Sequence, residues 1–251
     1  MPAKKKVTKA PGAGMTAKQK KRRKPINAEL MFPIEPLTEN QKIFFDEWDK
    51  GQMIYAYGVA GTGKTFIALY KALQDVLGDS TPYEKIYLVR SLVPSREIGF
   101  LPGDADDKSF LYQVPYKKMV QHMFQMPDDN AYEMLYENMK HQDTISFWST
   151  SFIRGTTFDN AIIIIDECQN LNFHELDSII TRVGDNSKII FCGDGVQTDL
   201  RNNHERAGLG DFMKVISMME SFSSVEFDIN DIVRSGLVKE YILAKHSLGM
   251  L

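Results

Sequence analysis

The sequence contains little cysteine and no long hydrophobic run. Cys168 and Cys192 are its only cysteines among 251 residues, and neither lies in a CxxC or zinc-type spacing. Two cysteines provide no disulfide framework, which favours a reducing compartment. No stretch of 18 apolar residues occurs, and the N-terminus lacks the apolar core of a secretory signal. We therefore expect a soluble cytoplasmic protein with no membrane partner.

Histidine is also sparse, and its distribution argues against a transition-metal centre. The five histidines are scattered along the chain, and no two stand at the spacing of a ligand pair. The sequence therefore indicates no metal other than the Mg²⁺ discussed below.

Acidic residues are missing from the first 24 positions. Ten of the 30 Lys and Arg residues lie there, which leaves 20 basic against 33 acidic residues in the remainder. Residues 1–24 are rich in Lys, Ala, Gly and Pro and have few apolar groups to bury, so we expect a disordered basic tail that binds polyanions. Residues 25–251 are long enough and apolar enough for a single globular domain.

Short apolar runs alternate with helical patterns along this domain, which is typical of an α/β fold with a mainly parallel sheet covered by helices on both faces. The first helix is expected to begin at Thr38. The expected strands are 53–57, 85–89, 144–148, 161–165, 188–192 and 224–227. The expected later helices are 64–77, 109–126, 129–141, 173–182, 205–220 and 236–247.

The first apolar run leads into GVAGTGKT at residues 58–65 and then into a helical pattern, which is the context that a P-loop requires. The glycines allow the backbone N–H groups to point at phosphate oxygens. Lys64 would reach the β- and γ-phosphates, and the Thr65 hydroxyl would ligate Mg²⁺. The residues predicted to bind ATP in this loop are Gly58, Ala60, Gly61, Thr62, Gly63, Lys64 and Thr65.

Two further strands end in polar residues. Asp166 follows four isoleucines and would hold Mg²⁺ through water, while Glu167 would polarise the attacking water; alternatively, the acids cap a helix. The run KIIFC leads into GDGVQTDL, where Gln197 would sense the γ-phosphate or orient the water. Taken alone, the Gly193–Gly195 segment could be only a tight turn.

In these motifs the chain closely resembles the PhoH-like family of P-loop ATPases, which are similar to the first motor domain of superfamily 1 helicases. The resemblance extends from Leu37 to about Ile242. Its further segments are LTENQ (37–41), VRSLVPSREIGFLPGD (89–104), FIRGTTFDNA (152–161) and DINDIVRSGLV (228–238). It implies that Gln41 reads the adenine edge and that Arg234 is an arginine finger. Cys168 and Cys192 depart from the family pattern and would make the site sensitive to thiol reagents.

The resemblance implies a RecA-like sheet in which the KIIFC strand lies between the other two motif strands. It also implies Mg²⁺-dependent ATP hydrolysis, in a bacterium or a phage-infected host. Hydrolysis could drive a nucleic-acid motor on RNA or single-stranded DNA, an adaptor module, or a simple NTPase. Because the chain has one motor domain, a motor would need a homo-oligomeric ring, for example a hexamer, with Arg234 acting on the neighbouring subunit.

Residues 109–141 are rich in methionine and tyrosine at helical spacing. Packing in the core or between subunits is the simpler interpretation. A stacking surface for single-stranded nucleic acid is the alternative.

Overall fold

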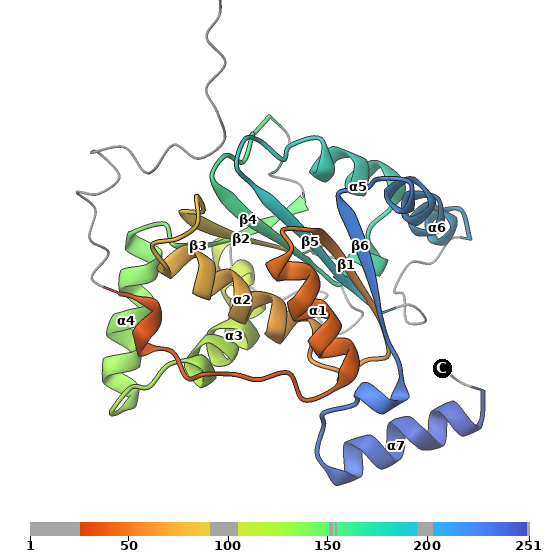
Figure 1. Cartoon of the computed structure of the whole chain (residues 1–251), viewed down its shortest axis with the longest axis horizontal. Helices are drawn as coiled ribbons and strands as arrows, with labels where there is room; N and C mark the ends of the chain where they lie inside the picture. Colours follow the sequence, from red (N-terminus) through yellow and green to blue (C-terminus); the bar gives the residue numbers. More distant parts are fainter. Residues whose placement is uncertain (1–25, 91–104, 151–152, 154, 195–202, 250–251) are drawn as a thin grey trace, which may run out of the picture.

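The computed structural model describes residues 26–90, 105–150, 153, 155–194 and 203–249 (Figure 1). The basic tail, the segment 91–104 and Gln197 lie outside these residues. The strands are β1 (Met53–Gly58), β2 (Lys85–Arg90), β3 (Ile145–Ser149), β4 (Ala161–Asp166), β5 (Lys188–Gly193) and β6 (Phe222–Phe227). The helices are α1 (Glu39–Asp49), α2 (Lys64–Leu77), α3 (Ala105–Met123), α4 (Asp129–His141), α5 (Phe173–Ile180), α6 (Asn203–Ser217) and α7 (Gly236–Ser247). Short 3₁₀ turns include η1 (Ala28–Leu30), η3 (Cys168–Asn170) and η4 (Ile229–Asp231).

The six strands form one sheet in the order β3-β2-β4-β5-β1-β6, and every neighbouring pair is parallel. This confirms the predicted parallel α/β fold, including β5 between β1 and β4. All residues of β4 and β5 are buried, as expected for central strands covered on both faces.

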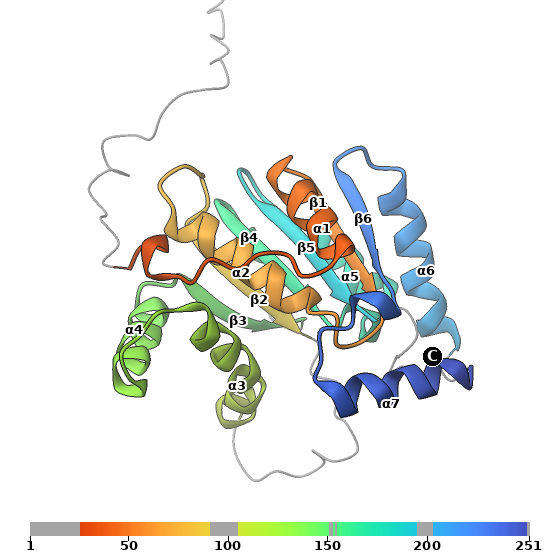
Figure 2. The ribbon, with the colours of Figure 1, turned by 60° about the horizontal axis from the view of Figure 1, so that its bottom comes forward.

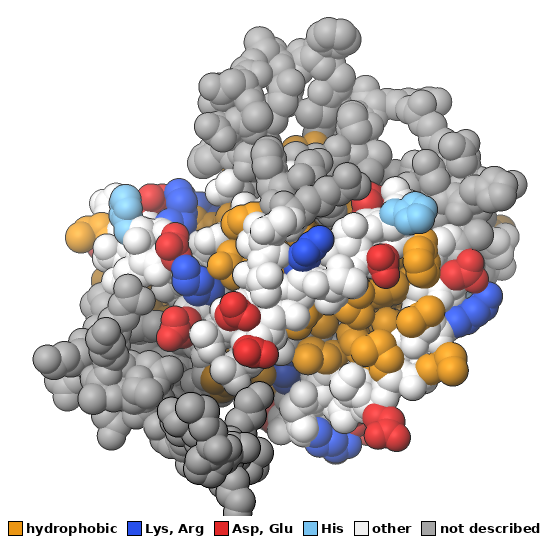
Figure 3. Space-filling view, turned by 90° about the horizontal axis from the view of Figure 1, so that it is seen from above, with side chains coloured by type: hydrophobic (Ala, Val, Ile, Leu, Met, Phe, Trp, Pro, Cys, Tyr) orange, Lys and Arg blue, Asp and Glu red, His pale blue; other side chains and the backbone are white. Residues whose placement is uncertain are grey.

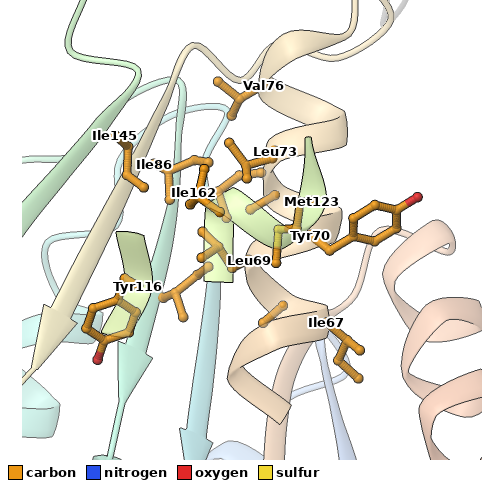
Figure 4. Packing of buried hydrophobic residues seen from close by; sticks show 14 of the residues in the cluster. Ile67, Leu69, Tyr70, Leu73, Val76, Ile86, Tyr116, Met123, Ile145 and Ile162 are labelled. Atoms are coloured by element: carbon orange, nitrogen blue, oxygen red, sulfur yellow. The ribbon is translucent and has the colours of Figure 1, made fainter. Parts of the chain in front are cut away.

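Helices cover both faces of the sheet (Figures 1 and 2). Successive residues of a strand point to opposite faces, so Ile162 and Ile164 pack with α1 to α4, whereas Ile163 and Ile165 pack with α5 and α6. Figure 4 shows the first of these layers, in which Leu69 and Leu73 of α2 lie against the sheet. The two hydrophobic cores fix α2 and the strand ends relative to each other.

The methionine- and tyrosine-rich segment forms α3 and α4, and most of its large side chains are buried. Tyr116, Met123, Tyr132, Tyr136 and Met139 all belong to the first core. This confirms core packing as the role of these residues. Helix α3 begins earlier than predicted and continues through Pro115.

Other hydrophobic side chains remain at the surface. Helix α7 contains no buried residue, and Leu237 and Tyr241 are largely exposed. Figure 3 shows hydrophobic side chains gathered on the face that is seen from above the view of Figure 1. Within the described part of the chain, no helix is both long enough and apolar enough to cross a membrane.

Candidate active site

Strands β1, β5 and β4 are neighbours in the parallel sheet, so the polar segments that follow them meet at one edge. A cavity of about 650 Å³ lies at this edge. Its lining includes the P-loop residues Ala60, Gly61, Gly63, Lys64 and Thr65, together with Asp166, Glu167, Asp194 and Arg234. The structure therefore brings together most of the residues that the sequence singled out.

The P-loop glycines adopt backbone conformations that other residues disfavour. The φ angles of Gly58, Gly61 and Gly63 are 124°, 81° and 86°. A Cβ added at Gly58 would lie only 1.9 Å from the Phe227 carbonyl oxygen of β6. Only glycine allows this close approach. The turn ends at Gly63, and α2 begins at Lys64 with its N-terminus toward the cavity.

The Lys64 ammonium lies within the curve of the P-loop. Its Nζ donates hydrogen bonds to the carbonyl oxygens of Gly58 (3.0 Å) and Val59 (2.8 Å), and to Thr62 Oγ1 (3.3 Å). Burial lowers the pKa of Lys64, while the charge of Asp194 and other nearby acids opposes this effect. This position suits a cation that contacts phosphate oxygens.

Thr65 and Asp166 are 101 positions apart in the sequence, yet Thr65 Oγ1 donates a hydrogen bond of 2.6 Å to Asp166 Oδ1. Hydroxyl and carboxylate oxygens are the ligands that Mg²⁺ prefers. Among the described residues, no group of three or more His, Cys, Asp or Glu could hold a metal. Mg²⁺ commonly binds with one or two carboxylates plus phosphate and water, so this oxygen pair fits it.

Glu167 occupies a strained position next to Asp166. Its φ of 54° lies in the left-handed region, which non-glycine residues rarely adopt. Gln169 Nε2 donates to Glu167 Oε2 (2.6 Å), and Arg90 Nη2 lies 4.0 Å from Glu167 Oε1. Burial raises the pKa of Glu167, and the adjacent Asp166 charge adds to this effect. A more basic carboxylate is better suited to accept a proton from water.

Gln41 lines the cavity and is held by backbone groups on either side of it. Its side chain is 3% exposed. Oε1 accepts a hydrogen bond from the Leu37 N–H (2.8 Å), and Nε2 donates to the Thr62 carbonyl oxygen (2.9 Å). The amide therefore joins the segment before α1 to the P-loop, and its contact with an adenine edge stays a prediction.

Arg234 lies over the P-loop of its own chain. The Val233 N–H donates to the Gly61 carbonyl oxygen (3.1 Å), which fixes the segment after η4 against the loop. A Cβ added at Gly61 would be 2.8 Å from Arg234 Cγ. The number of motor domains in the sequence predicts that Arg234 acts on a neighbouring subunit, but this geometry places its side chain in its own cavity.

The sequence profile of PhoH-like proteins matches residues 33–245. The chain belongs to the PhoH-like family. Its PhoH-like relatives include a protein of Mycobacterium leprae, 31% identical over 86% of this chain and 61% of the relative. A Bacillus subtilis relative is 30% identical, over 84% of this chain and 63% of its own length. The Escherichia coli K12 protein PhoH is 31% identical, over 84% and 58%. The chain thus spans about three fifths of the length of these relatives.

Two solved structures are similar in fold but distant in sequence. The large terminase of a thermophilic bacteriophage, solved with ADP, is 14% identical, with a TM-score of 0.47 over 82% of this chain and 49% of the terminase. A Bacteroides Pif1 in complex with ADP-AlF4 is 15% identical, with a TM-score of 0.38 over 87% and 47%.

Both cysteines of this PhoH-like chain are fully buried beside the site. Burial raises the pKa of each thiol, and the Asp166 charge adds to this effect. Because the thiolate is the reactive form, burial should slow the reaction of both thiols. Cys192 also lines the cavity, and the expected thiol sensitivity stays a prediction.

Arg90 ends the second expected strand, which predicts that it faces the ligand edge, and it lies beside Asp166 in the sheet register. Gln169 and Tyr116 had no assigned role in the sequence-based prediction. Gln169 Oε1 accepts a hydrogen bond from the Asp194 N–H (2.9 Å), so Gln169 links the Glu167 carboxylate to the end of β5. Tyr116 reaches Asp166 from α3. Gln169 could have been identified from the sequence more readily than Tyr116, because Gln169 lies in the motif that contains Asp166.

Proposed function

We propose that this PhoH-like protein binds ATP with Mg²⁺ and hydrolyses it. The observation that carries the proposal is the hydrogen bond between Thr65 of the P-loop and Asp166 at the end of β4. It joins the two oxygen groups expected to hold the metal, and Glu167 lies directly beside them. Phosphoryl transfer depends mainly on positioning and charge neutralisation, which this arrangement can provide.

Each part of the cavity has a proposed role. The P-loop backbone, Lys64 and the N-terminus of α2 would bind the phosphates. Thr65 and Asp166 would hold Mg²⁺, which supplies further charge neutralisation when bound. Glu167 would polarise the attacking water, and Gln197 would orient it. Apolar side chains would contact the base, and those lining the cavity include Ile34, Leu37 and Phe66.

We further propose that hydrolysis is coupled to RNA or single-stranded DNA. The support is the concentration of ten cationic residues in positions 1–24, followed by an acidic domain at 25–251. A hexameric ring in the cytoplasm remains part of the proposal. The exposed hydrophobic side chains of α7 are available for contacts between subunits. Because Arg234 lines the cavity of its own chain, we propose that it acts within that chain, so that no neighbouring subunit is needed to complete the site.

ATPase assays with and without single-stranded RNA and DNA test this coupling. We expect nucleic acid to raise the rate. Deleting residues 1–24 should flatten the salt dependence of binding, because fewer counterions are released, and should leave basal hydrolysis intact. An unchanged slope after the deletion would contradict the role of the tail. ATP-dependent partner binding without stimulation by nucleic acid would favour an adaptor. If neither stimulation nor partner binding is observed, a simple NTPase is indicated.

A further inference from the structure

Both carboxylate oxygens of Asp166 accept hydrogen bonds from side chains. Thr65 Oγ1 bonds to Oδ1, and the Tyr116 hydroxyl donates to Oδ2 at 2.5 Å. The first donor belongs to the P-loop. The second donor, Tyr116, belongs to α3 and precedes Asp166 by 50 positions in the sequence. The orientation of the Asp166 carboxylate is thus fixed from two elements.

The Tyr116 ring is itself held firmly. The side chain is 2% exposed, and its ring packs against Phe147 of β3 with a centroid separation of 5.5 Å. Figure 4 shows the ring in the first hydrophobic core, with the hydroxyl directed toward the carboxyl ends of the strands. A buried phenol with a fixed ring can direct its hydroxyl with little loss of conformational freedom.

Arg90 completes the arrangement around Asp166. Arg90 pairs with Asp166 in the β2–β4 register, and its Nη2 lies 4.0 Å from Glu167 Oε1, so its positive charge stands beside both acids. An ordinary tyrosine phenol is protonated at physiological pH, so the Tyr116 hydroxyl is the donor in its hydrogen bond to Asp166.

We propose that Tyr116 is a positioning residue for the Mg²⁺ site, because it holds Asp166 in the orientation that receives the metal's bound water. The inference rests on the proposed function, since it concerns the same metal. A carboxylate held on both oxygens needs no reordering when the metal arrives, so loss of one hydrogen bond should weaken metal binding.

The test uses Mn²⁺ as a paramagnetic probe in the presence of ADP. Wild-type protein, Tyr116→Phe and Tyr136→Phe are titrated with Mn²⁺, and free Mn²⁺ is measured by electron paramagnetic resonance. Tyr136 is the matched control, because it is also 2% exposed but its hydroxyl has no hydrogen-bond partner among the described residues. We expect Tyr116→Phe to raise the Mn²⁺ dissociation constant about five-fold or more, and Tyr136→Phe to leave it unchanged.

Two further measurements separate positioning from folding. ADP binding without metal should be equal in all three proteins, because the P-loop is intact. In an Asp166→Asn background, Tyr116→Phe should cause no further loss of Mn²⁺ affinity, since the partner carboxylate is gone. The proposal is overturned if Tyr116→Phe binds Mn²⁺ as tightly as wild type, or if its effect persists with Asp166→Asn. If wild-type protein itself binds no Mn²⁺ with ADP, the proposed function fails instead.

Discussion

Replacing Glu167 by Gln is expected to reduce ATP hydrolysis about 10²-fold or more while ATP still binds. The change removes the carboxylate that would polarise water but keeps the shape of the side chain. Lys64, Thr65 and Asp166 remain in place to hold the phosphates and Mg²⁺. Single-turnover hydrolysis and equilibrium binding of ATP measure the two effects separately.

Glu137→Gln is the matched control, because Glu137 is an exposed residue of α4 and pairs with Lys140 away from the cavity. It removes the same charge and should leave the rate unchanged. If Glu167→Gln hydrolysed ATP at the wild-type rate, Glu167 would not be the base.

Replacing Arg234 by Ala is expected to reduce hydrolysis about 10³-fold, since an arginine that stabilises transition-state charge contributes at least this much in other NTPases. The planar guanidinium stays ionised and can bind phosphate oxygens bidentately. Lys214→Ala is the control for loss of a cation, because Lys214 is an exposed residue of α6 that pairs with Asp211. This control should retain normal activity.

Mixing experiments decide whether Arg234 acts within its own chain. Arg234→Ala and Lys64→Ala are combined at several ratios, after subunit exchange has been shown independently. Because Arg234 lies against Gly61 of its own P-loop, we expect no recovery of activity at any ratio. Partial recovery would show that the arginine serves a neighbouring subunit, as the domain count alone suggested.

The sheet and the P-loop could be predicted because local sequence determines them strongly. Four consecutive isoleucines at 162–165 favour a central strand. The helical pattern after Thr65 identifies the preceding glycines as part of a P-loop. The parallel strand ends then bring Asp166 beside the loop. The order of β5 between β1 and β4 came from the family resemblance, since strand order is not encoded by periodicity.

The contacts that could not be predicted depend on tertiary structure. Tyr116 meets Asp166 only because α3 packs on the sheet at that point, and spacing within α3 cannot reveal its partner. Gln41 bonds to backbone groups whose positions follow from the path of the P-loop. Arg234 lies over Gly61 because the turn at η4 directs the chain back across the cavity. Each contact joins segments whose relative placement the sequence leaves open.

The release of γ-phosphate from labelled ATP is the most direct test of Mg²⁺-dependent hydrolysis at this site. It should be measured for wild-type protein and for Lys64→Ala, with Mg²⁺ and with a chelator. We predict release only by wild-type protein with Mg²⁺, because Lys64 is the cation held inside the P-loop. Equal release by Lys64→Ala, or release by wild-type protein that persists when Mg²⁺ is chelated, would contradict the account.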